Sequence, residues 1–190
     1  MSFAREFKEI VKAWLAISIA FGILIMQQGK SIGFSIGVAA ATVGLGFLVH
    51  ELSHRYYARK FGKHAEFKAN NMMLLVAIVM SFLGFIIAAP GAVIISGFVN
   101  RKEGGIIATA GPAANLIIAL IFLPLMLFMP SIAYYGLMIN AWLALFNLIP
   151  FPGFDGHRIM EWSKPVYFIM VGAAVALNVI HVILANYAPI

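Results

Sequence analysis

Residues 32–60 read IGFSIGVAAATVGLGFLVHELSHRYYARK. The first part of this stretch, 32–49, carries no charged side chain, and a helix needs about 20 apolar residues to cross a bilayer. Three ionisable residues, His50, Glu51 and His54, follow directly in the same run. The stretch therefore predicts a membrane-spanning helix with ionisable side chains near one end, where their insertion is costly and function is the default explanation.

The composition of the whole chain predicts the same class of protein. Of its 190 residues, 63% are hydrophobic and 11% are charged, with a mean hydropathy of +0.97. A soluble domain has about a quarter of its residues charged. Further long apolar runs cover residues 10–27, 106–129, 133–150 and 165–187. We therefore expect an all-α polytopic membrane protein, with 1–190 forming one domain whose core is 32–163.

The net charge of +6 does not indicate a nucleic-acid partner, because the basic residues flank the apolar runs. They are Arg5, Lys8 and Lys12, then Arg55, Arg59, Lys60, Lys63 and Lys68, then Arg101 and Lys102, and finally Arg158 and Lys164. Basic clusters beside membrane spans mark the cytoplasmic side. We therefore expect an integral protein of the cell membrane with a cytoplasmic N-terminus and the ionisable cluster near the cytoplasmic side.

The segment 72–99 decides the number of spans. If it crossed once, the basic residues at 101–102 and 158–164 would lie outside, against the positive-inside rule. If it enters and returns on one side, all basic clusters face the cytoplasm. We therefore expect five spanning helices and a re-entrant or extended segment at 72–99, with Pro90-Gly91 as its turning region. A sixth full helix at 72–89 is the alternative.

The spacing of His50 and His54 predicts a metal site. Residues i and i+4 of a helix lie on one face one turn apart, so two imidazoles can bind one zinc ion. Glu51 lies beside them and can act as the general base that takes a proton from a water molecule on the zinc. The alternative is that these residues only mark the end of the helix beside Arg55.

A catalytic zinc takes three protein ligands and keeps one position open. The chain contains one aspartate, Asp155, where the apolar run 133–150 ends in a stretch rich in proline and glycine. Asp155 is the candidate third ligand. It could also cap a short helix over 156–163, and the two roles are compatible.

The sequence resembles the site-2 proteases, a family of intramembrane zinc metalloproteases that cut transmembrane substrates. Three motifs carry the resemblance, in the order that the family has: His50-Glu51-Leu52-Ser53-His54, Ala110-Gly111-Pro112-Ala113-Ala114-Asn115, and the run from Asn147 to Asp155-Gly156. The resemblance implies one Zn²⁺ per chain held by His50, His54 and Asp155, with Glu51 as catalytic base. The implied reaction is hydrolysis of peptide bonds in transmembrane protein substrates within the bilayer, as in regulated intramembrane proteolysis.

The same resemblance implies roles for residues around the site. Asn147 looks like the family's polar residue near the substrate or the developing oxyanion. Gly111, Pro112 and Asn115 look like a contact of small residues that holds the core helices together. An extended strand that includes Ala92, Val93 and Ile94 would pair with the unwound substrate. The alternative for this strand is a buried packing segment.

The chain departs from the family pattern at one position after Asp155-Gly156. The family often has a second glycine after Asp-Gly, where this chain has His157, a side chain that could compete for the metal. The rival function is a membrane zinc-binding protein without hydrolysis, such as a transporter or an inactive scaffold. Such a protein needs no base beside the first histidine, so Glu51 favours the protease.

Overall fold

The computed structural model describes residues 3–86 and 90–187 as eight α-helices, one π-helical turn and two strands. In chain order they are α1 (Phe3–Met26), α2 (Ile32–Ala39), η1 (Ala40–Gly44), α3 (Leu45–Lys60), β1 (His64–Ala69), α4 (Asn71–Phe82), β2 (Gly91–Ser96), α5 (Arg101–Leu125), α6 (Pro130–Asn147), α7 (Asp155–Trp162) and α8 (Lys164–Tyr187).

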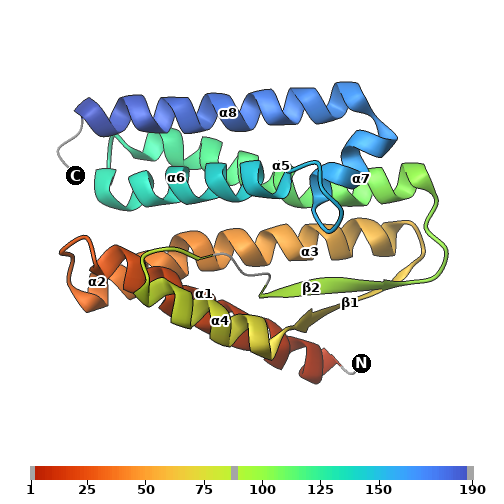
Figure 1. Ribbon diagram of the computed structural model, residues 1–190, viewed down its shortest axis with the longest axis horizontal. Coiled ribbons are helices and arrows are strands. Elements are labelled where there is room, and N and C mark those ends of the chain that lie inside the picture. Colours follow the sequence, from red (N-terminus) through yellow and green to blue (C-terminus); the bar gives the residue numbers. More distant parts are fainter. Residues whose placement is uncertain (1–2, 87–89, 188–190) are drawn as a thin grey trace.

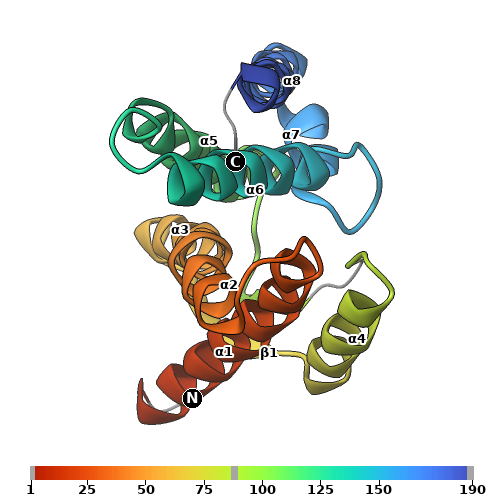
Figure 2. The ribbon, with the colours of Figure 1, turned by 90° about the vertical axis from the view of Figure 1, so that its left-hand side faces the viewer.

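The elements form two layers that meet along α3 and α5 (Figures 1 and 2). One layer holds α1 to α4 with the two strands, and the other holds α5 to α8. Buried apolar side chains such as Leu137 and Ile159 pack the second layer internally. Others, such as Val43 and Tyr135, join α6 to the first layer. Residues from both layers can therefore meet at the α3–α5 contact.

Four helical segments are long and apolar enough to cross a membrane: Ala4–Met26, Ile32–Lys60, Arg101–Leu125 and Lys164–Ala185. This supports the expected all-α membrane protein. The remaining predicted span, 133–150, corresponds to the 18-residue α6, which is not among these four segments, so the number of five spans stays a prediction. The segment considered for a sixth span contains α4, whose 12 residues fall short of the about 20 that a crossing needs.

The second predicted span is one continuous helix that contains a π-helical turn. α2, η1 and α3 follow each other without a break from Ile32 to Lys60. The carbonyl oxygen of Ala40 in the π turn accepts a hydrogen bond from Trp14 Nε1 of α1 at 3.2 Å. A π turn widens the helix and leaves carbonyls available for such contacts. It thereby fixes α1 against the segment that leads into the His50 region.

The chain reverses direction within the segment between α3 and α5. β1 and β2 are antiparallel, and Ala69 pairs with Gly91 at the inner end of the sheet. The chain reverses after Phe82, where α4 ends, so the prediction of a turning region at Pro90-Gly91 is wrong. Pro90 instead precedes β2, and its carbonyl oxygen accepts from the Asn70 N–H at 3.0 Å. β1 is a strand that the sequence analysis did not predict.

Basic residues from several elements lie at one end of the molecule. This basic end consists of Arg59 and Lys60 of α3, Arg101 and Lys102 of α5, Arg158 of α7 and Lys164 of α8. The start of α1 lies at the same end, while the C-terminus of α8 lies at the opposite end (Figure 1). Basic clusters that are separate in the sequence therefore lie together at one end of the fold.

Candidate metal centre

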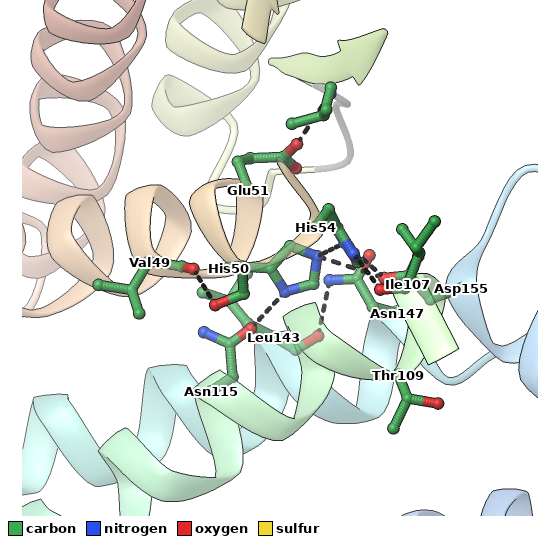
Figure 3. A network of polar contacts seen from close by, with 12 residues as sticks. Val49, His50, Glu51, His54, Ile107, Thr109, Asn115, Leu143, Asn147 and Asp155 are labelled. Atoms are coloured by element: carbon green, nitrogen blue, oxygen red, sulfur yellow. Dashed lines mark hydrogen bonds and ion pairs between the residues drawn. The ribbon is translucent and has the colours of Figure 1, made fainter. Parts of the chain in front are cut away.

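Three predicted ligands converge at the contact between the layers (Figure 3). His50 and His54 come from α3, and their Nε2 atoms lie 3.0 Å apart. Asp155 is the first residue of α7, and its Oδ2 lies 3.3 Å from His50 Nε2 and 3.2 Å from His54 Nε2. Among the described residues, these three form the group of side chains that could hold a metal ion.

The other ring nitrogen of each histidine has an oxygen acceptor. His50 Nδ1 lies 2.6 Å from Asn115 Oδ1, and His54 Nδ1 lies 2.8 Å from the Ile107 carbonyl oxygen. The backbone carbonyl cannot donate, so the proton of His54 belongs on Nδ1; we assign the same tautomer to His50 with Asn115 Oδ1 as acceptor. Both Nε2 atoms then carry lone pairs. This arrangement, with an oxygen behind each imidazole, is typical of zinc-binding histidines.

The geometry of the three atoms fits a zinc ion. With metal–ligand bonds of ~2.1 Å, two ligands of a tetrahedral zinc lie about 3.4 Å apart. The observed separations of 3.0–3.3 Å are close to this spacing. Two imidazole lone pairs and a carboxylate at these distances repel each other unless a cation lies between them. The donor set of two histidines and one carboxylate is one that catalytic zinc sites use.

Asp155 does not cap α7, contrary to the sequence-based expectation. Phe154 occupies the N-cap position without a capping side-chain hydrogen bond, and Asp155 begins the helix. The carboxylate is directed to the two histidines instead. An aspartate carboxylate is ionised at neutral pH, which is the form that a metal ligand requires.

Asn115 connects the site to three helices. Besides His50, its side chain contacts the Gly46 carbonyl oxygen at 3.1 Å and Asn140 Oδ1 at 3.0 Å, both as donor. Asn140 in turn donates to the Gly136 carbonyl oxygen at 2.9 Å. Asn115 and Asn140 are both fully buried. The network joins α3, α5 and α6 behind His50, so Asn115 contacts the metal centre as well as holding helices together.

Replacement of Asn115 by alanine is expected to weaken zinc binding about 10–100-fold, the usual effect of losing the partner behind a ligating histidine. The affinity is measured by competition with a chelator of known strength. The matched control is Asn178→Ala on α8, because the Asn178 amide donates to its own helix at the Ala174 carbonyl oxygen. Equal zinc affinity in the Asn115 variant and in the control would refute the role of Asn115.

Gly111 provides the space in which the two imidazoles lie. A Cβ atom at this position would overlap the Nε2 atoms of both His50 and His54. Gly111 follows Ile107 by one helical turn, so α5 both accepts from His54 and makes room for its ring. Pro112, the next residue of the predicted motif, is also buried in α5.

A Gly111→Ala substitution is therefore expected to displace the rings and reduce zinc affinity by about 10-fold or more, an effect like that of misorienting a ligand. Gly172→Ala on α8 is the control, because a Cβ there has nothing within 4 Å. Zinc content after dialysis is the readout. Full zinc retention by the Gly111 variant would mean that the rings do not need this space.

Glu51 lies on the side of α3 that faces β2. It is buried, and its Oε2 accepts a hydrogen bond from the Val93 N–H at 3.1 Å (Figure 3). The Glu51 carboxylate interacts electrostatically with His50, His54 and Asp155 without being one of the three candidate ligands. The role of Glu51 as the base beside a metal stays a prediction.

The two edges of the β-sheet differ in what covers them. At the β1 edge, Phe67 N–H donates to Glu6 Oε1 at 2.9 Å and Ala69 N–H to Glu9 Oε2 at 3.3 Å. Arg59 donates twice to the Ala65 carbonyl oxygen, at 2.8 and 3.0 Å. These contacts occupy the edge of β1 with side chains of α1 and α3.

The edge of β2 faces Glu51 and the metal centre. Val93 pairs with Phe67, and both of their N–H groups point away from the partner strand. Exposure alternates along β2, with Ala92 and Ile94 exposed and Val93 half-buried, so the strand is not a buried packing segment. An additional strand on β2 would replace the Val93 N–H contact with Glu51, whereas on β1 it would have to replace four contacts with Glu6, Glu9 and Arg59.

Two further predicted residues lie near the centre with other partners. Asn147 of α6 lies beside the cluster in Figure 3, and its amide nitrogen donates to the Leu143 carbonyl oxygen at 2.9 Å. His157 points along α7, with its Nε2 3.5 Å from Glu161 Oε1. His157 is not in the metal-binding group of the described residues.

Several residues that build the site were missed from the sequence. The Ile107 carbonyl oxygen is a backbone atom, which no side-chain pattern can reveal. Glu6 lies in the basic N-terminal segment yet is 5% exposed, and it accepts from Arg55 at 2.7 Å and from the Phe67 N–H. An acid among basic residues before a span was a usable signal for a buried ion pair.

Comparison with known proteins identifies relatives of one kind. The chain is 39% identical over 174 residues to "Putative zinc metalloprotease MJ0611" of Methanocaldococcus jannaschii, covering 87% of this chain and 88% of that protein. It is 30% identical over 156 residues to the protein YwhC of Bacillus subtilis, which has the same description, covering 65% and 68%. Rip2 of Mycolicibacterium smegmatis, which has the same description, is 30% identical over 139 residues, covering 62% of this chain and 53% of that protein. No family model matches the chain, and no solved structure matches it.

Proposed function

The chain belongs to the zinc metalloprotease family of these relatives, and from that premise we propose that it hydrolyses peptide bonds of transmembrane protein substrates inside the membrane. The observation that carries the proposal is the convergence of His50, His54 and Asp155 beside Glu51, between helices apolar enough to span a bilayer. The site-2 proteases are the metalloproteases of this kind that the sequence resembles.

We propose that His50 Nε2, His54 Nε2 and an Asp155 oxygen hold one zinc ion per chain. Zinc bound there supplies a Lewis acid, which polarises a carbonyl and lowers the pKa of water toward neutrality. Asn115 and the Ile107 carbonyl keep both imidazoles in the tautomer that presents Nε2. His50 and His54 are buried and Asp155 is partly buried, which limits contact with bulk water and strengthens their electrostatic effect.

Glu51 is the general base of the proposed reaction. Its carboxylate takes a proton from the attacking water and delivers it to the amine that leaves when the peptide bond breaks. The Val93 N–H holds this carboxylate in place before substrate arrives. Asn147 of α6, drawn beside the cluster in the view of Figure 3, is proposed to contact the substrate carbonyl.

The substrate is proposed to bind as a further strand on β2, through the backbone of Ala92, Val93 and Ile94. A helical amide is hidden by its own hydrogen bonds, so a transmembrane substrate must unwind before it is cut. Pairing with a strand edge compensates the freed backbone groups. This assignment is supported by the difference between the edges: α1 and α3 side chains bond to the β1 edge at Ala65, Phe67 and Ala69, whereas at the β2 edge the substrate would replace the contact of Glu51 with the Val93 N–H.

The basic end is proposed to face the cytoplasm. It gathers basic residues from α3, α5, α7 and α8, in agreement with the positive-inside rule. Arg55 follows His54 directly, so the metal centre would lie within about one to two helical turns of that surface. Transmembrane proteins would then be cut near the cytoplasmic end of their spans in the cell membrane.

The function is tested by incubating the purified protein in detergent with a panel of single-span substrates. We expect cleavage that stops on treatment with a zinc chelator and returns when zinc is added back. A protein that contains stoichiometric zinc and cuts no member of a broad panel would instead support a zinc-binding membrane protein without hydrolysis.

A further inference from the structure

A cavity of about 330 Å³ opens next to the metal centre, on its basic side. It lies between β2, the start of α5 and the second half of α7, and the residues around it include Val93, Ile95, Asn100, Arg101, Arg158 and Glu161. Its volume is large enough for one or two amino-acid side chains. None of the proposed catalytic steps uses it.

The cavity is positively charged. Arg101 and Arg158 contribute two guanidinium groups, and neither forms an ion pair with a carboxylate among the described residues. Arg101 donates to the backbone carbonyl oxygen of Glu161, and the Glu161 carboxylate is directed to His157 at 3.5 Å. The cavity also lies at the N-terminus of the 25-residue α5, where the helix dipole favours an anion.

Three of the elements around the metal centre, α5, α7 and β2, also line this cavity, a short distance further toward the basic end. On α5, Gly104 precedes Ile107 by about one turn, and on α7, Arg158 follows Asp155 by about one turn. On β2, Val93 contacts Glu51, and Ile95 lies about 7 Å further along the strand. A substrate strand that pairs with β2 at Val93, beside Glu51, therefore reaches the cavity about two to four residues further toward the basic end.

We propose that the cavity binds an acidic side chain of the substrate, about two to four residues from the scissile bond on the side of the basic end. This rests on the proposed function and narrows its substrate class. The carboxylate would pair with Arg158 and Arg101, whose guanidinium groups suit a carboxylate better than an ammonium group would. A peptide is favoured over a lipid headgroup because the cavity is lined by the strand to which the substrate backbone pairs.

The test is a set of single-span substrates in which one aspartate is moved through successive positions beside the scissile bond, with alanine and lysine at the same positions. The wild type is expected to cut the aspartate substrate with about 10-fold or higher kcat/KM than the lysine substrate at one position, as for a charge-assisted pair. Arg158→Ala should remove this preference and Arg158→Glu should reverse it. Lys102→Glu is the control, because Lys102 lies in the same first turn of α5 but does not line the cavity.

The absence of a charge preference at every position would overturn the proposal, as would a preference unchanged in both Arg158 variants. A second readout is the binding of a fluorescent peptide from the preferred substrate to the Glu51→Gln variant in detergent, with and without Arg158→Glu. If the wild type cuts nothing, the proposed function fails. Acid-dependent binding through Arg158 would still support the cavity assignment, and its absence would overturn it.

A lipid headgroup is separated by repeating the assay in phosphatidylcholine vesicles with and without phosphatidylglycerol. If Arg158→Glu changes only the response to phosphatidylglycerol and leaves the substrate preference intact, the cavity binds lipid and the proposal is wrong. If the aspartate preference depends on Arg158 in both kinds of vesicle, the proposal is supported.

Discussion

Replacing His54 by alanine is expected to abolish both zinc binding and proteolysis. His54 Nε2 lies 3.0 Å from His50 Nε2 and 3.2 Å from Asp155 Oδ2. Its removal leaves two of the three candidate ligands of the only potential metal-binding group in the described part of the chain. Losing a partner behind a ligand already costs about 10–100-fold in metal affinity, and the loss of a ligand costs more. Zinc content is measured by elemental analysis of the purified protein after dialysis.

The matched control is His181→Ala. His181 of α8 is as buried as His54, at 8% exposure each, and it packs against the Tyr134 ring at 4.6 Å, away from the metal-binding group. This variant should keep its zinc. A His54 variant that retains stoichiometric zinc would show that the metal, if bound, is held elsewhere.

Replacing Glu51 by glutamine is expected to stop catalysis while leaving zinc in place. Glutamine has nearly the shape of glutamate, and its carbonyl oxygen can still accept from the Val93 N–H, but it cannot take up a proton. Loss of a general base lowers the rate by about 10²–10⁴-fold. The measurement is kcat/KM on one single-span substrate, together with the zinc content of the same preparation.

The control for this variant is Glu66→Gln on β1, which removes a carboxylate from the same sheet region outside the metal centre. It should cut at the wild-type rate. Two results would remove Glu51 from the mechanism: a Glu51 variant with wild-type kcat/KM, or one whose lost activity is explained by lost zinc.

The convergence of the candidate metal ligands could be predicted because their spacing is local or their residue type is rare. His50 and His54 lie on one helix face by their separation alone. Asp155 stood out as the one aspartate of the chain, in a break between apolar runs. The extended segment at 91–96 was also predictable, since β-branched residues follow Pro90-Gly91 directly.

The partners of these residues depend on tertiary contacts that periodicity does not encode. The acceptor for His54 is a backbone carbonyl, and β1 forms because Glu6, Glu9 and Arg59 satisfy its outer edge. The reversal after Phe82 was misplaced because proline and glycine mark a turn or a strand start equally well. The capping role of Asp155 was wrong because the two histidines attract the same carboxylate.

The buried asparagines were only partly recognised. Asn115 was assigned to helix packing as part of a motif, whereas its side chain also contacts His50 and Asn140. An amide in an apolar span is costly without partners, so its presence was a sign of a polar network. The identity of the partners required the positions of α3, α5 and α6.

The central claim is hydrolysis of a peptide bond within a transmembrane span, and mass spectrometry of the products tests it most directly. A single-span substrate is incubated with zinc-loaded wild-type protein in water enriched in ¹⁸O. We predict one pair of products, cut inside the apolar span near its cytoplasmic end, with ¹⁸O in the new carboxylate. Intact substrate from zinc-loaded protein, or cuts only outside the span, would contradict the account.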